Sequence, residues 1–168
     1  MIFETTRLYV RQLEENDEAA FFELMSNPNV MDPIPQKPLD KAESISQLTE
    51  LILWEKSSDT KIWCLCEKGC NNLIGISGVL KNDEKEDEIA YRIIETYWGN
   101  GYGTEITKGL IDYCFVKLKS DLVTADVWVD NVKSVKILNK YFTAKKEFFN
   151  AEDNCIDRRY ILKRENWQ

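Results

Sequence analysis

The part of this sequence best suited to chemistry is a loop with glycines at alternate positions, Gly99, Gly101 and Gly103. A predicted strand leads into this loop and a predicted helix follows it. Glycine allows unusual backbone dihedral angles and lets the main chain approach a ligand closely. The exposed N–H groups at the start of a helix, with the helix dipole behind them, favour a bound phosphate. The loop therefore predicts a pyrophosphate site, although a glycine-rich turn that binds nothing also fits the loop alone.

Two common phosphate-binding motifs do not match this loop. A P-loop requires the pattern G-x-x-x-x-G-K-[ST], which the sequence lacks. The dinucleotide-binding fingerprint requires G-x-G-x-x-G, and counting from Gly99 its last position is Thr104. That fingerprint also belongs to the first β–α turn of a fold, whereas this loop lies past the middle of the chain. A nucleotide-binding module is therefore disfavoured.

The cysteines and the lack of histidine limit the chemistry further. Cys64, Cys66 and Cys70 lie close together, but their C-x-C-x3-C spacing is not the paired spacing of a structural zinc site. A fourth ligand would have to come from the distant Cys114 or Cys155. We therefore expect no metal, and expect Cys64 and Cys66 to be small apolar residues on one face of a strand. Without histidine there can be no Ser–His or Cys–His nucleophile pair, which excludes most hydrolases.

Length and charge indicate one acidic domain, residues 1–168, in which 43% of the residues are hydrophobic. The 22 basic and 29 acidic residues give a net charge of −7, which argues against a nucleic-acid-binding surface and favours cationic partners such as amines. No segment approaches the roughly 18 consecutive apolar residues of a membrane span. The N-terminus also lacks the pattern of a secretory signal. We therefore expect a cytoplasmic protein with no membrane partner.

The first third of the chain predicts two helices separated by a loop. Asn16 is the expected N-cap of a helix that buries Ala19, Phe22 and Met25. Four prolines between positions 28 and 38 predict a loop. A D-x-x-E capping box, formed by Asp40 and Glu43, then predicts a helix that continues to about position 56.

The rest of the chain predicts a meander of strands followed by a β-loop-α-β unit. Helices are expected over residues 104–118 and 132–141. The expected fold class is α/β, of the mixed α+β kind, with a central sheet of about seven strands, mostly antiparallel, and about four helices. The predicted strands are residues 6–13, 61–67, 73–81, 88–94, 122–129, 145–149 and 158–163.

Four segments of the sequence resemble the RimJ/RimL-like branch of the GNAT acetyltransferases. Residues 97–105 match its Y-W-G-x-G-Y-[AG]-T-E string, in which Trp98 replaces the Gln or Arg usual in the family's coenzyme A loop. Residues 5–11 resemble the opening T-x-R-L-x-L-R strand, residues 88–91 the E-I-G-Y strand, and residues 130–134 the D-N-x-x-S helix start. The resemblance spans nearly the whole chain in the right order. It departs at residues 141–143, where Tyr-Phe-Thr replaces the family's L-G-F.

This resemblance implies a GNAT-like domain that transfers an acetyl group from acetyl-CoA to a primary amine, by direct attack through a tetrahedral intermediate and without a metal. It implies that the coenzyme lies between the strand ending near residue 94 and a splayed strand ending near residue 129. A backbone N–H near Arg92 or Ile93 would then meet the oxyanion. The coenzyme-binding residues that the resemblance implies are Ile93, Ile94, Trp98, Gly99, Asn100, Gly101, Tyr102, Gly103, Thr104, Asn131 and Ser134.

The resemblance also suggests groups for proton transfer. An amine acceptor is mostly protonated at neutral pH, and Glu88 begins the strand that leads to the reaction centre, so it is the candidate base. A solvated position at the edge of the acidic run 83–88 is the alternative. Ser134 is the candidate acid for the leaving thiolate, with helix capping as its alternative. Tyr141 is a further candidate, two residues beyond Asn139, which occupies the place of the family's tyrosine.

The amine acceptor stays open between a ribosomal-protein N-terminus, a polyamine, an antibiotic amine and another metabolite. It is expected to enter between the two N-terminal helices, over the loop at residues 28–38. The apolar residues Met31, Ile34, Trp54 and Trp63 could line this entrance, and ordinary core positions are the preferred alternative. An acyl-CoA-binding sensor or scaffold without turnover is the alternative function. The sheets of the family often dimerise, so a homodimer is left open.

Overall fold

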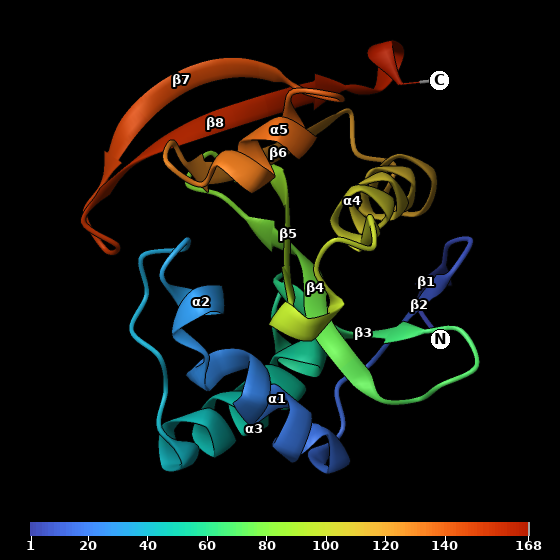
Figure 1. Ribbon diagram of the computed structural model, residues 1–168. Helices are drawn as coiled ribbons and strands as arrows, with labels where there is room; N and C mark the ends of the chain where they lie inside the picture. The colour runs from blue at the N-terminus through green and yellow to red at the C-terminus, as the bar shows by residue number, and fades with distance from the viewer. Residues whose placement is uncertain (168) are drawn as a thin grey trace.

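Within residues 1–167, which this computed structural model describes, eight strands form one sheet in the order β1-β2-β3-β4-β5-β6-β8-β7 (Figure 1). All neighbouring strands are antiparallel except β5 and β6, which are parallel. The expected α/β fold with a mostly antiparallel sheet is confirmed, and the eighth strand is the two-residue β1. The strands are β1 Phe3–Glu4, β2 Leu8–Arg11, β3 Lys61–Glu67, β4 Leu73–Lys81, β5 Asp87–Ile93, β6 Leu122–Trp128, β7 Thr143–Asn150 and β8 Cys155–Lys163.

Helices cover both faces of the sheet and enclose two separate cores (Figure 1). In strand β3, Trp63 and Leu65 belong to the core beneath α4 and α5, whereas Cys64 and Cys66 belong to the core beneath α1 to α3. This alternation is the period of two of a strand buried on both faces. It confirms Cys64 and Cys66 as small apolar core residues. The helices are α1 Glu18–Ser26, α2 Pro28–Met31, α3 Lys41–Ser57, α4 Tyr102–Tyr113 and α5 Val132–Leu138.

Strands β5 and β6 separate after a short stretch of pairing. Their register contains two pairs, Asp87 with Val123 and Glu88 with Thr124. Strand β6 continues beyond these pairs as the partner of β8, from Leu122 to Trp128. The sheet is therefore open between the carboxyl halves of β5 and β6.

Two predictions for the N-terminal third are wrong. Asn16 is not an N-cap but lies in a 3-10 turn, Glu15–Asp17, and α1 buries Phe21, Leu24 and Met25. The physical reason is Asp17, which accepts from Arg11 at 2.7 Å and so anchors the turn on β2. That anchor delays the helix and rotates its buried face away from Ala19 and Phe22.

The proline-rich segment is also more ordered than predicted. It contains α2, Pro28–Met31, whose start is capped by Asn27, the acceptor for the Asn29 N–H at 2.9 Å. Proline is well suited to the first turn of a helix, because an N–H there has no helical partner. The remainder, residues 32–40, is the loop that the prolines predicted.

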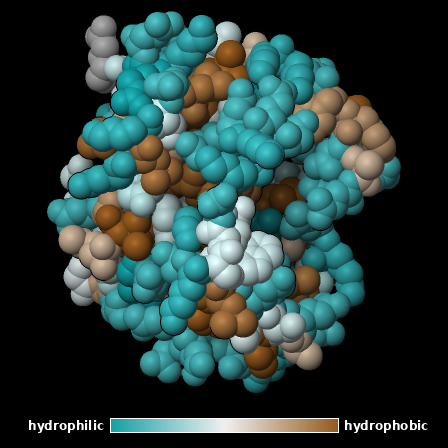
Figure 2. Space-filling model, turned by 180° about the vertical axis from the view of Figure 1, so that it is seen from behind, coloured by the Kyte–Doolittle hydropathy of each residue, from teal (hydrophilic) through white to brown (hydrophobic). Residues whose placement is uncertain are grey.

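Most of the hydrophobic surface is internal, and the face in Figure 2 is dominated by hydrophilic residues with smaller hydrophobic areas among them. Among the described residues, no helix combines the length and the apolar character needed to cross a bilayer.

The strands β3 and β4 match their predicted ranges, while β7 and β8 are longer than predicted, because each pairs with the other along its length.

The capping box of α3 is formed as predicted and can be tested. The Asp40 carboxylate accepts from the Glu43 N–H at 2.9 Å, and Glu43 accepts from the Asp40 N–H at 2.8 Å. Asp40→Ala should lower the free energy of unfolding by about 1 kcal/mol in denaturant titrations, because a helix-end N–H loses its acceptor. Asp40→Asn keeps an acceptor and should stay near the wild type; an equal loss in both variants would contradict this account.

Candidate functional site

The opening between β5 and β6 exposes backbone groups of β5. Ile94 donates its N–H to the Ile74 carbonyl of β4 at 2.9 Å. Because pairing alternates along an antiparallel ladder, the N–H groups of Tyr91 and Ile93 point away from β4, toward β6. By the same rule the backbone N–H of Arg92 points toward β4. Of the two expected oxyanion donors, Ile93 therefore faces the opening and Arg92 does not.

Ile94, which the sequence analysis assigned to the coenzyme site, does not face the opening. Its N–H is already bonded to β4, and its side chain is buried at 3% exposure in the core beneath α1 to α3. The alternation that directs Ile93 to one face of the sheet sends Ile94 to the other.

The glycine loop presents a row of free donors. Gly99 and Gly101 have φ values of 82° and 80°, in the left-handed region that favours glycine. The first hydrogen bond of α4 runs from the Glu105 N–H to the Gly101 carbonyl. Within the described chain, the N–H groups of residues 99–104 have no hydrogen-bond partner. This is the donor arrangement at a helix N-terminus that binds a phosphate.

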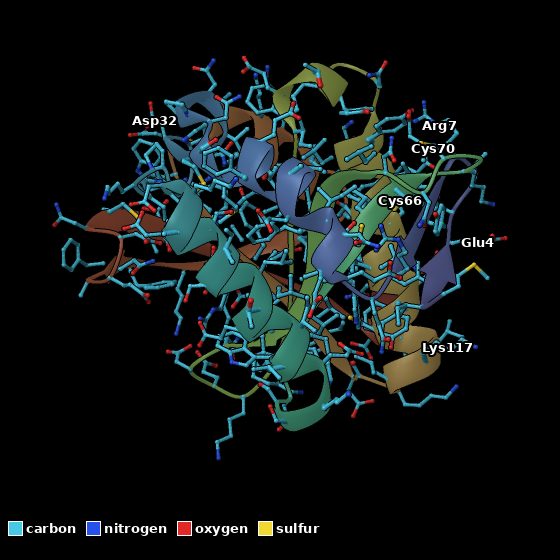
Figure 3. The ribbon with its side chains drawn as sticks, turned by 90° about the horizontal axis from the view of Figure 1, so that it is seen from below. Glu4, Arg7, Asp32, Cys66, Cys70 and Lys117 are labelled. Carbon is cyan, nitrogen blue, oxygen red and sulfur yellow. The ribbon has the colours of Figure 1, made fainter. Side chains whose placement is uncertain are left out.

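Arg7, which the sequence analysis did not assign to the site, lies against the loop. It comes from the segment between β1 and β2, on the side of the molecule where Figure 3 labels Cys66 and Cys70. Its side chain donates to the Asn100 carbonyl at 2.9 Å and to Glu105 at 2.7 Å. Glu105 is thereby committed to holding Arg7 and the loop, which argues against its use as a base.

A second cation lies at the same loop. Lys133, on α5, places its ammonium 4.3 Å from the centre of the Trp98 ring. Trp98 in turn donates its indole N–H to the Ile93 carbonyl at 2.8 Å and so braces the end of β5 against the loop. A cation held beside free backbone donors increases the attraction of the loop for an anion.

Ser134 and Asn131 lie across the opening from β5. Asn131 accepts from the Ser134 N–H at 3.2 Å, so the predicted helix cap is present. Hydrogen bonding to Ser134 and Thr107 lowers the pKa of the Tyr91 hydroxyl, but burial is the larger effect and the pKa is raised. A side chain at Gly103 would contact this hydroxyl at 3.1 Å, so this glycine is needed for packing between α4 and Tyr91.

Two cavities meet at this point. The first, of about 790 Å³, is lined by the glycine loop, the start of α5 and the end of β5. The second, of about 780 Å³, is lined by β5, β6, α3 and the β7–β8 connection. Both include Tyr91, Arg92, Asn131 and Ser134, so the structure brings the predicted acid and base to one space, with Glu88 in the second cavity. Residues of the predicted set that line the first are Ile93, Trp98, Gly99, Gly101, Tyr102, Gly103, Thr104, Asn131 and Ser134.

Glu88 is a half-buried carboxyl on the wall of the second cavity rather than the solvated end of a charge run. Burial raises its pKa to about 8, the nearby Asp126 adds to the increase, and Arg159 opposes it. Its carboxyl has no hydrogen-bond partner among residues 1–167. A carboxyl with these properties can accept a proton near neutral pH.

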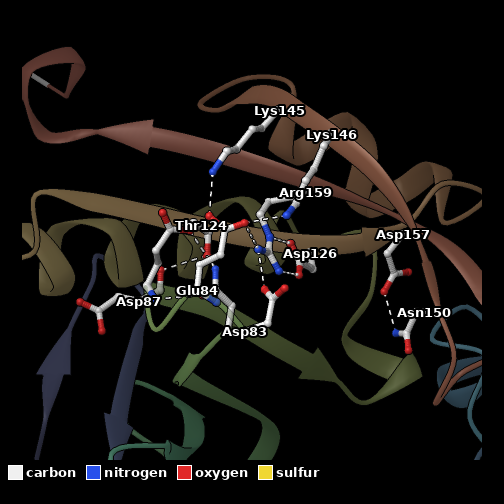
Figure 4. Close-up of polar contacts among 12 residues, drawn as sticks. Asp83, Glu84, Asp87, Thr124, Asp126, Lys145, Lys146, Asn150, Asp157 and Arg159 are labelled. Atoms are coloured by element: carbon white, nitrogen blue, oxygen red, sulfur yellow. Dashed lines mark hydrogen bonds and ion pairs between the residues drawn. The ribbon is translucent and has the colours of Figure 1, made fainter.

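The charges around Glu88 are largely committed to one another (Figure 4). Arg159 forms ion pairs with Asp126 at 2.7 Å, Asp83 at 2.6 Å and Glu84 at 3.0 Å. Because these three carboxylates share the guanidinium, Arg159 forms no ion pair with Glu88 and only partly offsets the rise in its pKa. Glu88 therefore lacks an ion pair because the nearby guanidinium is already paired with other carboxylates.

Tyr141 does not reach the opening in the way predicted. Its ring lies edge-on to Trp167, with 5.9 Å between the ring centres. Asn139, the position of the family's tyrosine, accepts from the Tyr160 hydroxyl at 2.9 Å. The chain beyond α5 is thus fixed by contacts with the C-terminal segment, and these contacts carry Tyr141 away from Ser134.

The residues at the expected acceptor entrance divide into two groups. Met31 and Trp63 are core residues, with exposures of 1% and 2%. Ile34 and Trp54 instead line the second cavity, so the expectation of ordinary core positions is wrong for them. A search of the described residues found no group of three or more Cys, Asp or Glu side chains arranged to hold a metal ion.

Comparison with known proteins gives consistent matches. A family model described as acetyltransferase (GNAT) domain matches residues 7–141. YoaA of Bacillus subtilis (strain 168), an uncharacterized N-acetyltransferase, is 31% identical over 146 residues, which cover 83% of this chain and 80% of the relative. A GNAT-family acetyltransferase structure from Bacillus anthracis has a TM-score of 0.83 at 21% identity and covers 96% of this chain and 98% of its own. The structure of RimL, a ribosomal L7/L12 α-N-protein acetyltransferase in complex with coenzyme A, has a TM-score of 0.79 at 19% identity, with 96% and 97% covered.

The burial of Glu88 makes a prediction about stability. Because its folded-state pKa of about 8 exceeds the reference value of 4.5, the folded protein retains a proton that the unfolded chain loses in this range. Stability from this group is present below pH 4.5 and is lost as the pH rises toward 8. Glu88→Gln should therefore gain stability over the wild type across this window, by roughly 2–4 kcal/mol above its upper end. Denaturant titrations across this range test it, and a difference that is constant with pH would contradict it.

Proposed function

The chain belongs to the GNAT acetyltransferase family, and from this premise we propose that it transfers an acetyl group from acetyl-CoA to a primary amine. The observation that carries the proposal is the opening between β5 and β6, which joins the free N–H groups of the glycine loop to the cavity that contains Glu88. The segments that resemble the RimJ/RimL-like branch lie around this opening, and we propose that branch for the chain.

We propose that the backbone of residues 99–104 holds the pyrophosphate of the coenzyme, with Arg7 and Lys133 adding positive charge. The fit rests on the free donors of the loop and on the left-handed backbone at Gly99 and Gly101. The N–H of Ile93 faces the opening and is suited to stabilise an oxyanion. Neither contribution depends on the chemistry of a side chain in the loop.

Glu88 is proposed as the base and Ser134 as the acid. A carboxylate at Glu88 would accept the proton of the incoming ammonium, directly or through water, and leave a nucleophilic amine. The Ser134 hydroxyl, in the first turn of the helix that Asn131 caps, would donate to the departing thiolate. A thiolate is already a tolerable leaving group, so the acid contributes less than the base.

Charge reversal at the loop tests the coenzyme site. Lys133→Glu should weaken the binding of acetyl-CoA at least tenfold in isothermal titration, because an anion replaces a cation beside the phosphate donors. Lys136→Glu is the matched control, with the same change at an exposed position of the same helix. Loss of binding in both variants would indicate a general charge effect, and no binding by the wild type at millimolar ligand would overturn the proposal.

The base can be tested by turnover across pH. Glu88→Gln should lower kcat/KM by roughly 10²–10³-fold, and the acid limb near pH 8 should disappear from the ratio of wild-type to variant rates. The ratio removes the titration of the acceptor amine, which is common to both proteins. Ser134→Ala should have the smaller effect. Binding of acetyl-CoA without turnover of any amine would instead support the sensor or scaffold alternative.

A further inference from the structure

Arg92 is a half-buried cation, on the wall of both cavities, that the proposed chemistry does not use. Its side chain leaves β5 on the face of α1 and α2, where one amino group donates to Gln36 at 2.8 Å. The other lies 3.4 Å from the thioether sulfurs of Met25 and Met31. Sulfur is a weak acceptor, so much of the donor capacity of the guanidinium is unused. Burial lowers the pKa of Arg92 to about 10, and the nearby Asp153 carboxylate offsets only part of this effect.

The two arginines that are buried in the described chain have carboxylate partners. Arg11 is paired with Asp17 at 2.7 Å, and Arg159 is paired with three carboxylates. Arg92 has no carboxylate within ion-pair distance among residues 1–167. A charge that is partly removed from water and forms no ion pair is costly, and its position on a cavity wall allows a partner to arrive from outside.

The position of Arg92 identifies the side of the site from which that partner arrives. Successive side chains of β5 alternate between the two faces of the sheet, so Glu88, Ala90 and Arg92 share one face. All three line the second cavity. Tyr91, on the opposite face, contacts the glycine-loop helix at Gly103. Arg92 also lines the first cavity, but its guanidinium contacts Met25 and Gln36, which line only the second, acceptor cavity.

We propose, resting on the proposed function, that Arg92 binds an anionic group of the acceptor, so that the substrate class is primary amines that also carry a carboxylate. A guanidinium is well suited to a carboxylate, because it can donate two parallel hydrogen bonds. The rest of the cavity suits the ammonium end of such a molecule. Glu88, Asp153 and Asp157 line it, and Gln36 connects Arg92 to Asp153 by donating to that carboxylate at 3.3 Å.

The experiment compares matched acceptors. Amino acids with one reactive amine are each assayed beside the carboxamide that replaces the carboxylate, and lysine beside 1,5-diaminopentane. The wild type should give a kcat/KM at least tenfold higher for the acids, and Arg92→Met should remove that preference. Methionine fits a site already lined by Met25 and Met31. Arg92→Gln serves as a second variant if Arg92→Met is unstable, and Arg158→Met, outside both cavities, should keep the preference.

Each other outcome counts against the inference in a distinct way. Equal or better turnover of the neutral analogues by the wild type overturns it. An equal loss for all acceptors would make Arg92 part of the general chemistry, and weaker acetyl-CoA binding in Arg92→Met would assign it to the coenzyme; either overturns the inference and leaves the proposed function standing.

A binding measurement separates this inference from the proposed function. N-acetylated amino acids and their carboxamides are titrated against the wild type and Arg92→Met by calorimetry, without acetyl-CoA. Tighter binding of the acid, lost in the variant, supports the anion site even where no amine is turned over. Equal binding of acid and amide, or no binding of either, overturns it. Absence of acetyl-CoA binding and of turnover would overturn the proposed function instead.

Discussion

The separation of β6 from β5 is the constraint on which the rest of the site depends. After two paired residues the ladder ends, and the N–H groups of Tyr91 and Ile93 lose the partners that a continuous sheet would provide. Buried backbone donors without partners are costly, so the opening is stable only where a ligand or water completes it. The same separation creates the space in which the proposed thioester and amine would meet. One break in the sheet therefore supplies both the donors and the room for the reaction.

The segments that the sequence predicted well are those decided by neighbours along the chain. The capping box at Asp40 depends on residues three apart, and the glycine loop depends on backbone conformations that only its own residues control. The predictions that failed depended on distant contacts. The Arg11–Asp17 pair displaces the start of α1, and Trp167 holds Tyr141 away from the opening. A pattern of types and spacing contains no information on such partners.

The same limit explains which site residues were missed. Arg7 and Lys133 lie far apart in sequence and reach one loop only because β2 and α5 flank it. The resemblance included both segments, but it did not indicate that Arg7 or Lys133 would contact the glycine loop. Arg92 could have been suspected because it is the one charged residue in the otherwise apolar or aromatic second half of β5, residues 89–93. Its lack of a carboxylate partner, on which the proposed anion site is based, is visible only in the structure.

Glu88 and Arg92 together suggest how acceptor binding and base activation are linked. Empty, the cavity holds a carboxyl whose pKa is raised by burial and a guanidinium without a counter-ion. An acceptor that brings an ammonium toward Glu88 favours its ionised form, because an opposite charge lowers the pKa of a carboxyl. An anionic group of the acceptor would at the same time compensate the charge of the Arg92 guanidinium. Glu88 would then be ionised when the amine is bound. The burial that raises its pKa would also make the ionised carboxylate a stronger proton acceptor.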